Sequence, residues 1–303
     1  MVNDRIVFMN GDLVPWDRAT LPLMSHSLGR GSAIFEVLGF HDTYRGPAIF
    51  RLDEHVRRLF RTAQLLEMEL PLSYDDICDA VIQTTSRNNL RSGYIKIIGY
   101  YPQIAFEILP PQSTLDIAIF IIDPAEDHVD SESDQGVSLC ISGWMKLDPR
   151  TVPVAAKVAA NYLNGMLARL DAAKRGLDYA IMLDTAGFVA EGGTESIFFV
   201  KDGTLMTPAL GTVLDSITRK SLIQVAEFAG IDTREGHFSP DLLFEADEIF
   251  LSGTPSKLLP VYKIDEHPLG KVPGPLTHTL SHHVTDIIAG RNEHFAHWLF
   301  PVI

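Results

Sequence analysis

The sequence predicts a mixed α+β protein built from two domains. A chain of 303 residues is long for one hydrophobic core. Strand-like runs rich in β-branched and aromatic residues are interspersed with amphipathic helices, which is typical of mixed α/β folds. Residues 123–135 interrupt this pattern, because they are acidic and almost free of apolar side chains, which favours an exposed linker. We therefore expect a small N-terminal α+β domain over 1–122 and a larger C-terminal domain over 136–303.

The N-terminal half begins with a predicted hairpin over 6–15, since two apolar runs flank Asn10-Gly11, a dipeptide that readily adopts positive φ. A helix over 54–68 is expected to start with Asp53 as its cap. Ser73 and Asp76 have the spacing of a capping box for a helix that ends near residue 89. Further strands are expected over 32–40, 94–101 and 115–122.

The C-terminal half continues the mixture of helices and strands. A helix over 161–175, ending at Gly176, is expected to bury one face that carries Leu163, Met166, Leu167 and Leu170. A second helix starts after Asp215 and ends at Gly230. The remaining predicted elements are short helical or extended segments: helices from 239 and over 275–289, and strands over 137–141, 178–184, 196–200, 204–207 and 248–252.

The composition excludes several classes of partner. A net charge of −14 gives no electrostatic footprint for nucleic acid or for an anionic membrane. Cys78 and Cys140 stand alone, so neither a disulfide framework nor a zinc site is expected from them. Residues 1–10 include charges and no apolar run long enough for a signal peptide or a membrane helix. We expect a soluble cytoplasmic protein.

Metal binding is also not expected. His278, His282 and His283 share a predicted helix, and His294 lies three residues before His297. No carboxylate or cysteine set completes either group as a metal site. The sequence contains no phosphate-binding P-loop, no dinucleotide fingerprint and no nucleophile elbow.

The residues that carry chemistry lie in the stretch 157–200. Lys157 follows the apolar run 152–156, where partial burial favours a neutral amine, and Glu191 lies towards the far end of the stretch. Such a pair suits a cofactor whose aldehyde needs an amine and whose ring nitrogen needs a negative counter-charge.

Four motifs in order resemble the fold-type IV enzymes that use pyridoxal 5'-phosphate, and within them the branched-chain amino-acid aminotransferases. The motifs are Lys157-x-x-x-Asn161-Tyr162-Leu163, Glu191-Gly192-x-x-Glu195-Ser196, Ile217-Thr218-Arg219 and Leu251-Ser252-Gly253-Thr254. Residues 26–36 and 50–59 are similar to the family's N-terminal domain as well. The resemblance therefore covers nearly the whole chain and implies a two-domain, D-amino-acid/branched-chain aminotransferase-like fold.

The resemblance implies a role for each motif. Lys157 would bind the cofactor aldehyde and later move the Cα proton, Glu191 would hold the pyridine nitrogen, and Tyr162 would hydrogen-bond the phenolic oxygen. The phosphate would be held by Arg58, with Arg57 left at the surface. A helix N-terminus is a natural seat for a phosphate, so the remaining phosphate contacts would come from Ser216, Ile217, Thr218 and Thr254. Ser216 stands where the family usually has glycine.

The substrate residues depart from the family pattern. Branched-chain enzymes typically show Phe-Glu-Gly-x-Arg, whereas this chain has Phe35-Glu36-Val37-Leu38-Gly39. Arg30 replaces a usual tyrosine, and the usual Tyr-Ile-Arg is Tyr94-Ile95-Lys96. Either Arg30 and Lys96 take over carboxylate binding, or the substrate is not the standard one, or both are surface strand residues. The full set of predicted substrate residues is Arg30, Phe35, Gly39, Tyr94, Lys96, Gly193, Thr194 and Pro255.

The expected function is transamination between a branched-chain-like hydrophobic L-amino acid and a 2-oxo acid such as 2-oxoglutarate. The resemblance implies a homodimer or a higher homo-oligomer, in which Arg30 would act on the partner's pocket. The alternatives are a D-amino-acid or amine-type transaminase on the same fold, a lyase of the aminodeoxychorismate type, and a non-catalytic protein that binds the cofactor.

Overall fold

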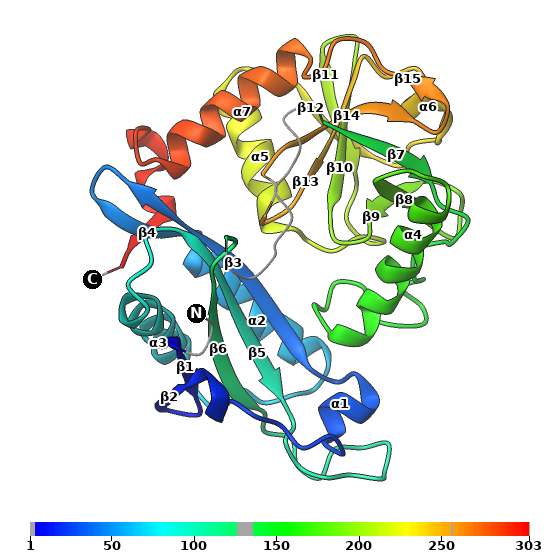
Figure 1. Cartoon of the computed structure of the whole chain (residues 1–303). Coiled ribbons are helices and arrows are strands. Elements are labelled where there is room, and N and C mark those ends of the chain that lie inside the picture. Colours follow the sequence, from blue (N-terminus) through cyan, green and yellow to red (C-terminus); the bar gives the residue numbers. More distant parts are fainter. Residues whose placement is uncertain (1–3, 126–135, 256, 303) are drawn as a thin grey trace. The chain divides into compact units, whose positions relative to one another are not determined.

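The computed structural model describes residues 4–125, 136–255 and 257–302, and the chain folds as two compact units (Figure 1). The first unit comprises Met1–Asp130, Ala156–Ala160 and Asp286–Ile303, and the second comprises Ser131–Ala155 and Asn161–Thr285. Two segments that the sequence placed in the C-terminal domain, 156–160 and 286–303, therefore pack with the first unit. Most of the predicted linker, residues 126–135, lies outside the described residues, so the exact domain boundaries stay a prediction.

The first unit is built on a seven-stranded antiparallel sheet in the order β16-β4-β3-β5-β6-β1-β2. The predicted hairpin is confirmed, because Met9 pairs with Asp12 around Asn10 and Gly11, which have φ of 51° and 101°. The C-terminal strand β16 was not predicted. The strands are β1 (Ile6–Met9), β2 (Asp12–Pro15), β3 (Ile34–Thr43), β4 (Gly46–Phe50), β5 (Gly93–Tyr100), β6 (Asp116–Ile122) and β16 (Leu299–Pro301).

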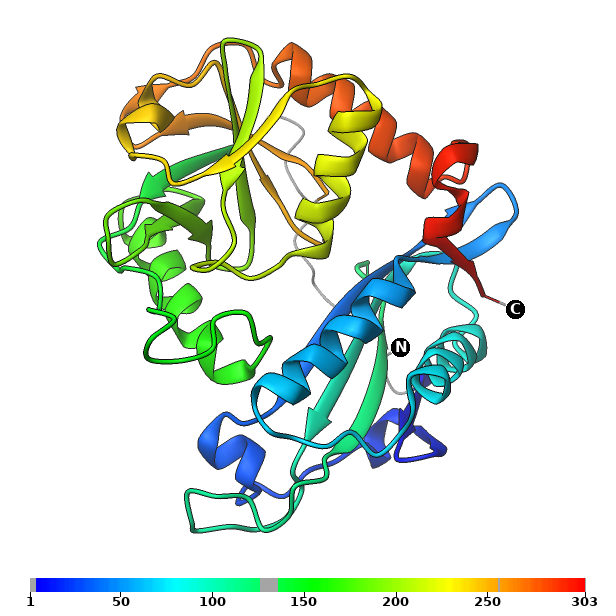
Figure 2. The ribbon, with the colours of Figure 1, turned by 180° about the vertical axis from the view of Figure 1, so that it is seen from behind.

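Two long helices, α2 (Leu52–Leu65) and α3 (Tyr74–Arg87), pack on this sheet (Figure 2). The core between them holds aliphatic side chains from both layers, which alternate along the strands with residues on the other face. The capping box at α3 is confirmed, with Ser73 and Asp76 bonded reciprocally. The first unit also contains the short helix α1 (His26–Arg30) and the 3₁₀ segments Trp16–Arg18 and Glu293–Trp298, and a third 3₁₀ segment, Ala159–Asn161, ends the stretch after Lys157.

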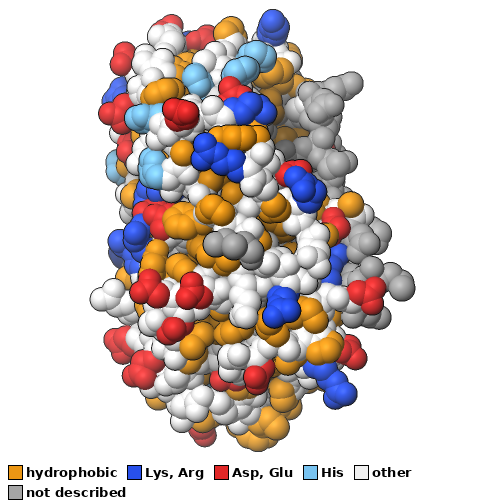
Figure 3. Space-filling view, turned by 90° about the vertical axis from the view of Figure 1, so that its left-hand side faces the viewer, with side chains coloured by type: hydrophobic (Ala, Val, Ile, Leu, Met, Phe, Trp, Pro, Cys, Tyr) orange, Lys and Arg blue, Asp and Glu red, His pale blue; other side chains and the backbone are white. Residues whose placement is uncertain are grey.

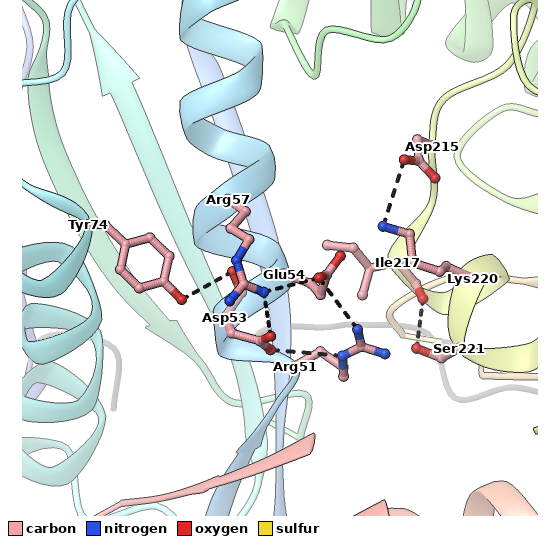
Figure 4. A network of polar contacts seen from close by, with 9 residues as sticks. All are labelled: Arg51, Asp53, Glu54, Arg57, Tyr74, Asp215, Ile217, Lys220 and Ser221. Carbon is pink, nitrogen blue, oxygen red and sulfur yellow. Dashed lines mark hydrogen bonds and ion pairs between the residues drawn. The ribbon is translucent and has the colours of Figure 1, made fainter. Parts of the chain in front are cut away.

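The prediction that Asp53 caps α2 is wrong. The helix begins at Leu52, and its N-cap is Arg51, whose φ of 53° is left-handed and which provides no side-chain cap. The Arg51 amide donates to Trp298 O at 2.7 Å, and its guanidinium lies 4.6 Å from the Trp298 ring. This contact from the end of the chain sets where the helix starts. Asp53 instead accepts from Arg57 within the first turns of the helix (Figure 4).

The second unit is built on a nine-stranded mixed sheet in the order β12-β11-β10-β13-β14-β7-β8-β9, with β15 paired to β14. β7 runs parallel to β8 and β14, and β11 runs parallel to β12. The strands predicted over 137–141, 178–184, 196–200, 204–207 and 248–252 are confirmed as β7 (Val137–Ile141), β8 (Tyr179–Leu183), β10 (Ser196–Lys201), β11 (Thr204–Pro208) and β13 (Glu248–Ser252). The sheet also contains strands outside these predicted ranges: β9 (Val189–Gly192), β12 (Thr233–Gly236), β14 (Leu259–Ile264) and β15 (His267–Pro268).

The helix α4 (Tyr162–Lys174) exists as predicted but buries a different face. Leu163 and Met166 are 58% and 52% exposed, whereas Gly165, Ala168 and Ala172 are buried. The helix backbone packs so closely that only small side chains fit beneath it. The prediction of a buried leucine face is therefore wrong. The other helices are α5 (Ile217–Phe228), α6 (Asp241–Phe244) and α7 (Pro275–Ile288), close to their predicted positions.

The surface carries charges of both signs. On the face shown in Figure 3, acidic and basic side chains are interspersed, so the net charge of −14 is not gathered into one patch there. No helix in the described parts of the chain is long and apolar enough to span a membrane. Within the same residues, no group of three or more histidine, cysteine or acidic side chains is arranged to hold a metal ion.

Candidate active site

Lys157 lies in a short extended segment alongside β3. Phe35 N donates to Lys157 O at 3.0 Å, and Val158 forms an antiparallel bridge with Ile34. On the helix side, Lys157 N donates to Thr62 Oγ1 at 3.1 Å. Both backbone polar groups of Lys157 are thus bonded, which fixes the point from which its side chain projects. Its Nζ lies 4.9 Å from the centre of the Phe35 ring.

Four of the predicted substrate residues share one face of the first sheet. Gly39 pairs with Tyr94 across β3 and β5, and Lys96 pairs with Val37, two residues along. Because strand side chains alternate, Phe35 is on the same face as these residues. Lys96 Nζ lies 5.5 Å from the Phe35 ring. The register therefore brings one apolar ring, one phenol and one ammonium group together without an arginine.

Arg30, the fifth predicted substrate residue of the N-terminal half, ends helix α1. Its NH2 donates to Phe106 O at 2.8 Å, so it ties the loop after β5 to α1. The same loop is joined to α1 by His26, whose Nε2 lies 3.0 Å from Ile108 O.

Arg58 projects from α2 toward the opposite, core-facing side of β3. Its Nε donates to Glu36 Oε1 and its NH2 donates to Glu36 Oε2, both at 2.7 Å. His55 Nδ1 lies 2.7 Å from the same Oε2, one helical turn earlier. Glu36 is fully buried, whereas the neighbouring Arg57 is exposed, as predicted.

The protonation states in this cluster follow from burial and pairing. Burial by itself would raise the pKa of Glu36, but the charge of Arg58 and the hydrogen bonds from Arg58 and His55 lower it to about 2. Burial lowers the pKa of His55 to about 4, although Glu36 acts in the opposite direction. At neutral pH the carboxylate is ionised and the imidazole is neutral, so His55 carries its proton on Nδ1 and donates it to Glu36.

Glu191 lies near the end of β9 with its side chain largely buried. Lys146 Nζ lies 2.6 Å from Glu191 Oε1, and Leu214 N donates to Oε2 at 3.2 Å. The carboxylate is therefore held on both oxygens. The Leu214 contact also joins it to the segment that leads into α5.

The turn after β9 carries two predicted substrate residues, Gly193 and Thr194. Glu195 holds this turn, because the Thr194 amide donates to its Oε2 at 3.0 Å and the Thr194 hydroxyl donates to its Oε1. An ideal Cβ on Gly165 of α4 would lie 2.2 Å from Gly193 O, so helix and turn are in backbone contact. Thr194 O lies 3.8 Å from the Cβ position of Gly253, which places it beside the turn that carries Thr254 and Pro255.

The predicted phosphate residues of the second unit lie at the start of α5. Ser216 is the N-cap, and its Oγ accepts from Arg219 N at 3.3 Å, while Ile217 and Thr218 form the buried first turn. Lys220 lies 3.8 Å from Asp215, and Ser221 donates to Ile217 O (Figure 4). The helix N-terminus supplies the partial positive charge that favours an anion. Tyr162 is the first residue of α4.

Comparison with known proteins identifies the family. The sequence model described as amino-transferase class IV matches residues 33–264. This chain belongs to the class IV aminotransferases. The branched-chain-amino-acid aminotransferases of Salmonella typhimurium and Escherichia coli K12 are each 33% identical to it over 299 residues, covering 98% of this chain and 97% of theirs.

Solved structures give the same result. The branched-chain aminotransferase from Thermoproteus uzoniensis, solved with norvaline, has a TM-score of 0.93 and 31% identity over 99% of each chain. The branched-chain amino acid aminotransferase from Escherichia coli has a TM-score of 0.93 and 32% identity, again with 99% of each chain covered. The predicted fold-type IV architecture and the prediction of a transferase enzyme are confirmed.

Three residues of this class IV aminotransferase were missed by sequence reasoning. Glu36 and His55 were not assigned a role, although a charged residue at a core-facing position of a strand indicates a buried partner. Lys146 gave no local signal, because its pairing with Glu191 joins residues 45 positions apart. The roles of the predicted site residues remain predictions, and the geometry above shows which of them lie together.

Proposed function

We propose that this class IV aminotransferase exchanges amino groups between a branched-chain-like hydrophobic L-amino acid and a 2-oxo acid such as 2-oxoglutarate, with pyridoxal 5'-phosphate as its cofactor. The relatives above carry branched-chain names. Another solved branched-chain amino acid aminotransferase, 33% identical to this chain, has been complexed with N-(5'-phosphopyridoxyl)-L-glutamate and with pyridoxamine 5'-phosphate. The observation that carries the proposal is the fixed Lys157 beside the Phe35 ring in a chain of this family.

The residues present fit the cofactor. Lys157 supplies the amine, Glu191 the counter-charge, Tyr162 a phenol, and Arg58 with the N-terminus of α5 the cationic and amide groups that suit a phosphate. When bound, the cofactor supplies an aldehyde that condenses with amines and a ring that accepts an electron pair.

The side chains of this enzyme would then move the proton and bind the substrate. The Lys157 amine would take the proton from the substrate Cα and deliver it to the cofactor carbon that carried the aldehyde, and in the second half of the reaction it would move a proton in the opposite direction. The aromatic ring of Phe35 offers an apolar surface for a hydrophobic substrate side chain. Its contacts with Lys157 and Lys96 place this surface beside both ammonium groups. Lys96, on the same sheet face as Tyr94, is the cation that we assign to a substrate carboxylate.

The remaining substrate contacts are assigned to two neighbouring turns. Gly193 and Thr194 form the first turn, which Glu195 holds in place, and Thr254 and Pro255 follow Gly253 in the second. The Gly193 amide and the amide and hydroxyl of Thr254 are donors of the kind that suit a carboxylate, whereas Pro255 has no N–H and the Thr194 donors already bond Glu195.

A D-amino-acid transaminase is a second candidate, and one specific observation favours it. Gly39 stands opposite Tyr94, where the branched-chain pattern has an arginine, so the sheet face lacks that positive charge. The chirality of the substrate depends on which side its carboxylate is bound, and this substitution alters the distribution of cations on that face.

A panel of amino donors separates these candidates. Purified enzyme with bound cofactor is mixed with L-leucine or D-alanine, without a 2-oxo acid, and the visible absorbance of the cofactor is followed. Loss of the visible band with L-leucine supports the proposal, whereas loss with D-alanine alone supports the second candidate. Pyruvate released from an aminodeoxychorismate-type substrate without any 2-oxo acid would identify a lyase instead.

The role of Lys157 has its own test. Lys157→Ala is expected to abolish transamination, whereas Lys174→Ala, an exposed lysine at the end of α4, should leave it unchanged. Normal turnover by Lys157→Ala would refute the proposed chemistry, and a wild-type protein that binds the cofactor without turning over any donor would instead be one that only binds the cofactor.

We also propose that the enzyme is a homodimer or a higher homo-oligomer, and an exposed apolar surface in the first unit supports this. Segments 23–28 and 104–109 are joined by a bridge between Ser25 and Ile104 and by the Ala105 amide, which donates to Met24 O. A large, contiguous apolar surface on a monomer indicates an interface. Its exposed side chains are Leu23, Met24, Leu28, Ile104, Phe106, Ile108 and Leu109.

Sedimentation of the wild-type enzyme and of a Phe106→Ser/Ile108→Ser variant tests this assembly. The wild type is expected to sediment as a dimer or larger, and the variant as a smaller species. A monomeric wild-type enzyme would refute the proposed assembly.

A further inference from the structure

A carboxylate is buried beneath the phosphate arginine that we assign to this enzyme. Glu36 lies on the core-facing side of β3 between Ile34 and Leu38, and all three side chains are fully buried. Its two oxygens accept three hydrogen bonds, two from Arg58 and one from His55, each at 2.7 Å.

Stability alone does not account for this arrangement. A buried ion pair generally adds little to stability, because the cost of removing both charges from water offsets their attraction. An aliphatic residue at position 36 would complete the apolar stripe formed by Ile34 and Leu38 at a lower desolvation cost. A buried carboxylate at this position therefore points to a requirement of the site rather than of the core.

The geometry of the contact indicates what that requirement is. Glu36 bonds the edge of the guanidinium formed by Nε and NH2. Because the guanidinium is planar, its other donors, on NH1 and NH2, form a second edge directed away from Glu36. The bidentate contact thus fixes the orientation of that second edge, which a flexible arginine would otherwise have to find when an anion binds.

His55 holds the carboxylate in turn. It lies one turn before Arg58 on the same helix, and its Nδ1–H bonds Oε2, the oxygen that also accepts from Arg58 NH2. Lys157 is close enough for its charge to contribute to lowering the pKa of His55, so this cluster and the reactive lysine belong to the same part of the first unit.

We propose that Glu36 is a positioning residue that, supported by His55, orients the Arg58 guanidinium for the 5'-phosphate of the cofactor. The inference rests on the proposed function, which assigns the phosphate to Arg58. Glu36 itself does not contact the cofactor in this proposal, because it acts on the far edge of the guanidinium.

Comparison of two ligands that differ only in the phosphate tests the inference. The full-length enzyme, freed of cofactor, is titrated with pyridoxal 5'-phosphate and with pyridoxal. The quantity measured is the dissociation constant for pyridoxal divided by that for pyridoxal 5'-phosphate, referred to below as the ratio. Glu36→Gln keeps the shape of the side chain but removes its charge. It should weaken binding of pyridoxal 5'-phosphate about tenfold to a hundredfold, as expected for a charged hydrogen-bond partner, and leave pyridoxal binding within about twofold.

Two further variants sharpen the result. Glu54→Gln removes an acidic group from the exposed side of the same helix, where it bonds Arg57, and should keep the wild-type ratio. In an Arg58→Met background, Glu36→Gln should not reduce the ratio any further, because the group that it positions is absent. If Glu36→Gln does not fold, His55→Leu provides the same test and should also lower the ratio below its wild-type value.

The outcomes separate this inference from the proposed function. A folded Glu36→Gln enzyme that keeps the wild-type ratio, or that loses affinity for both ligands equally, would overturn the positioning role alone. If Glu36→Gln does not fold, an unchanged ratio in the His55→Leu enzyme would overturn the positioning role. A wild-type enzyme that binds the two ligands equally would overturn the phosphate role of Arg58 as well, and a wild-type enzyme that binds neither would overturn the proposed cofactor.

Discussion

Replacement of Gly165 by alanine is the sharpest structural test, because it acts on the contact that positions the turn of Gly193 and Thr194. An ideal Cβ at position 165 would lie 2.2 Å from Gly193 O and 2.9 Å from both Gly193 C and Cα. Cβ atoms essentially never approach other heavy atoms closer than 3.0 Å, so helix and turn must separate by about 0.8 Å. All the contacted atoms belong to the backbone, and no side chain can rotate to relieve the clash.

Two opposing terms decide the magnitude. Alanine is intrinsically favoured over glycine inside a helix by about 1 kcal/mol. Overpacking of a well-packed contact costs about 1–3 kcal/mol, and the upper end applies where only backbone can move. We expect Gly165→Ala to lower the free energy of unfolding by about 1–2 kcal/mol, which corresponds to a fall in Tm of roughly 2–8 °C. The Michaelis constant for the amino acid should rise, because the displaced turn carries Gly193 and Thr194.

Thermal unfolding by circular dichroism, together with steady-state kinetics, measures both effects. Ala173→Gly, at an exposed position of the same helix, calibrates helix propensity without any contact to the turn and should cost about 1 kcal/mol with unchanged kinetics. A Gly165→Ala enzyme as stable as the wild type, with an unaltered Michaelis constant, would refute the close contact between helix and turn.

Three further predictions concern the charged and capping residues. The pKa of His55 is lowered in the folded state from 6.5 to about 4. The neutral imidazole therefore contributes up to about 3 kcal/mol to the free energy of unfolding above pH 6.5, and this contribution is lost as the pH falls toward 4. His55→Asn should flatten the unfolding free energy between pH 6.5 and 4 in urea titrations, and an unchanged slope would contradict this. Lys146→Met leaves Glu191 without its cation and should cost about 3 kcal/mol in the same assay, whereas Lys146→Arg should cost much less; equal losses would argue against the pair. Ser73→Ala should lower the unfolding free energy by about 1 kcal/mol through loss of the capping box, and no change in the urea midpoint would show that the cap is unimportant.

The sequence predicted well those features that short stretches of chain control. The Asn10-Gly11 turn and the capping box at Ser73 were both confirmed, because each depends on the φ values or hydrogen bonds of residues only a few positions apart. The four motifs that begin with the one containing Lys157 identified the family for a different reason, since their order and spacing match a known set of enzymes.

Features that depend on a distant partner were predicted less well. The helix α4 was expected to bury its leucines, yet it buries Gly165 and Ala168, since the face that turns inward is chosen by what the helix packs against. Asp53 was expected to cap α2, but a contact between Arg51 and Trp298, 247 residues apart in the sequence, moves the start of the helix.

By itself, the sequence determined the order and type of most helices and strands and the family, because turn residues, caps and motif spacing are local properties of the chain. Only the tertiary structure showed that Lys157 lies along β3 in the first unit, that Glu36 holds Arg58, and that Lys146 pairs with Glu191. Each of these contacts joins residues more than 20 positions apart. In the two charge pairs, Glu36 with Arg58 and Lys146 with Glu191, the partner is chosen by burial, since a charge removed from water must be paired by whichever group the fold brings within reach.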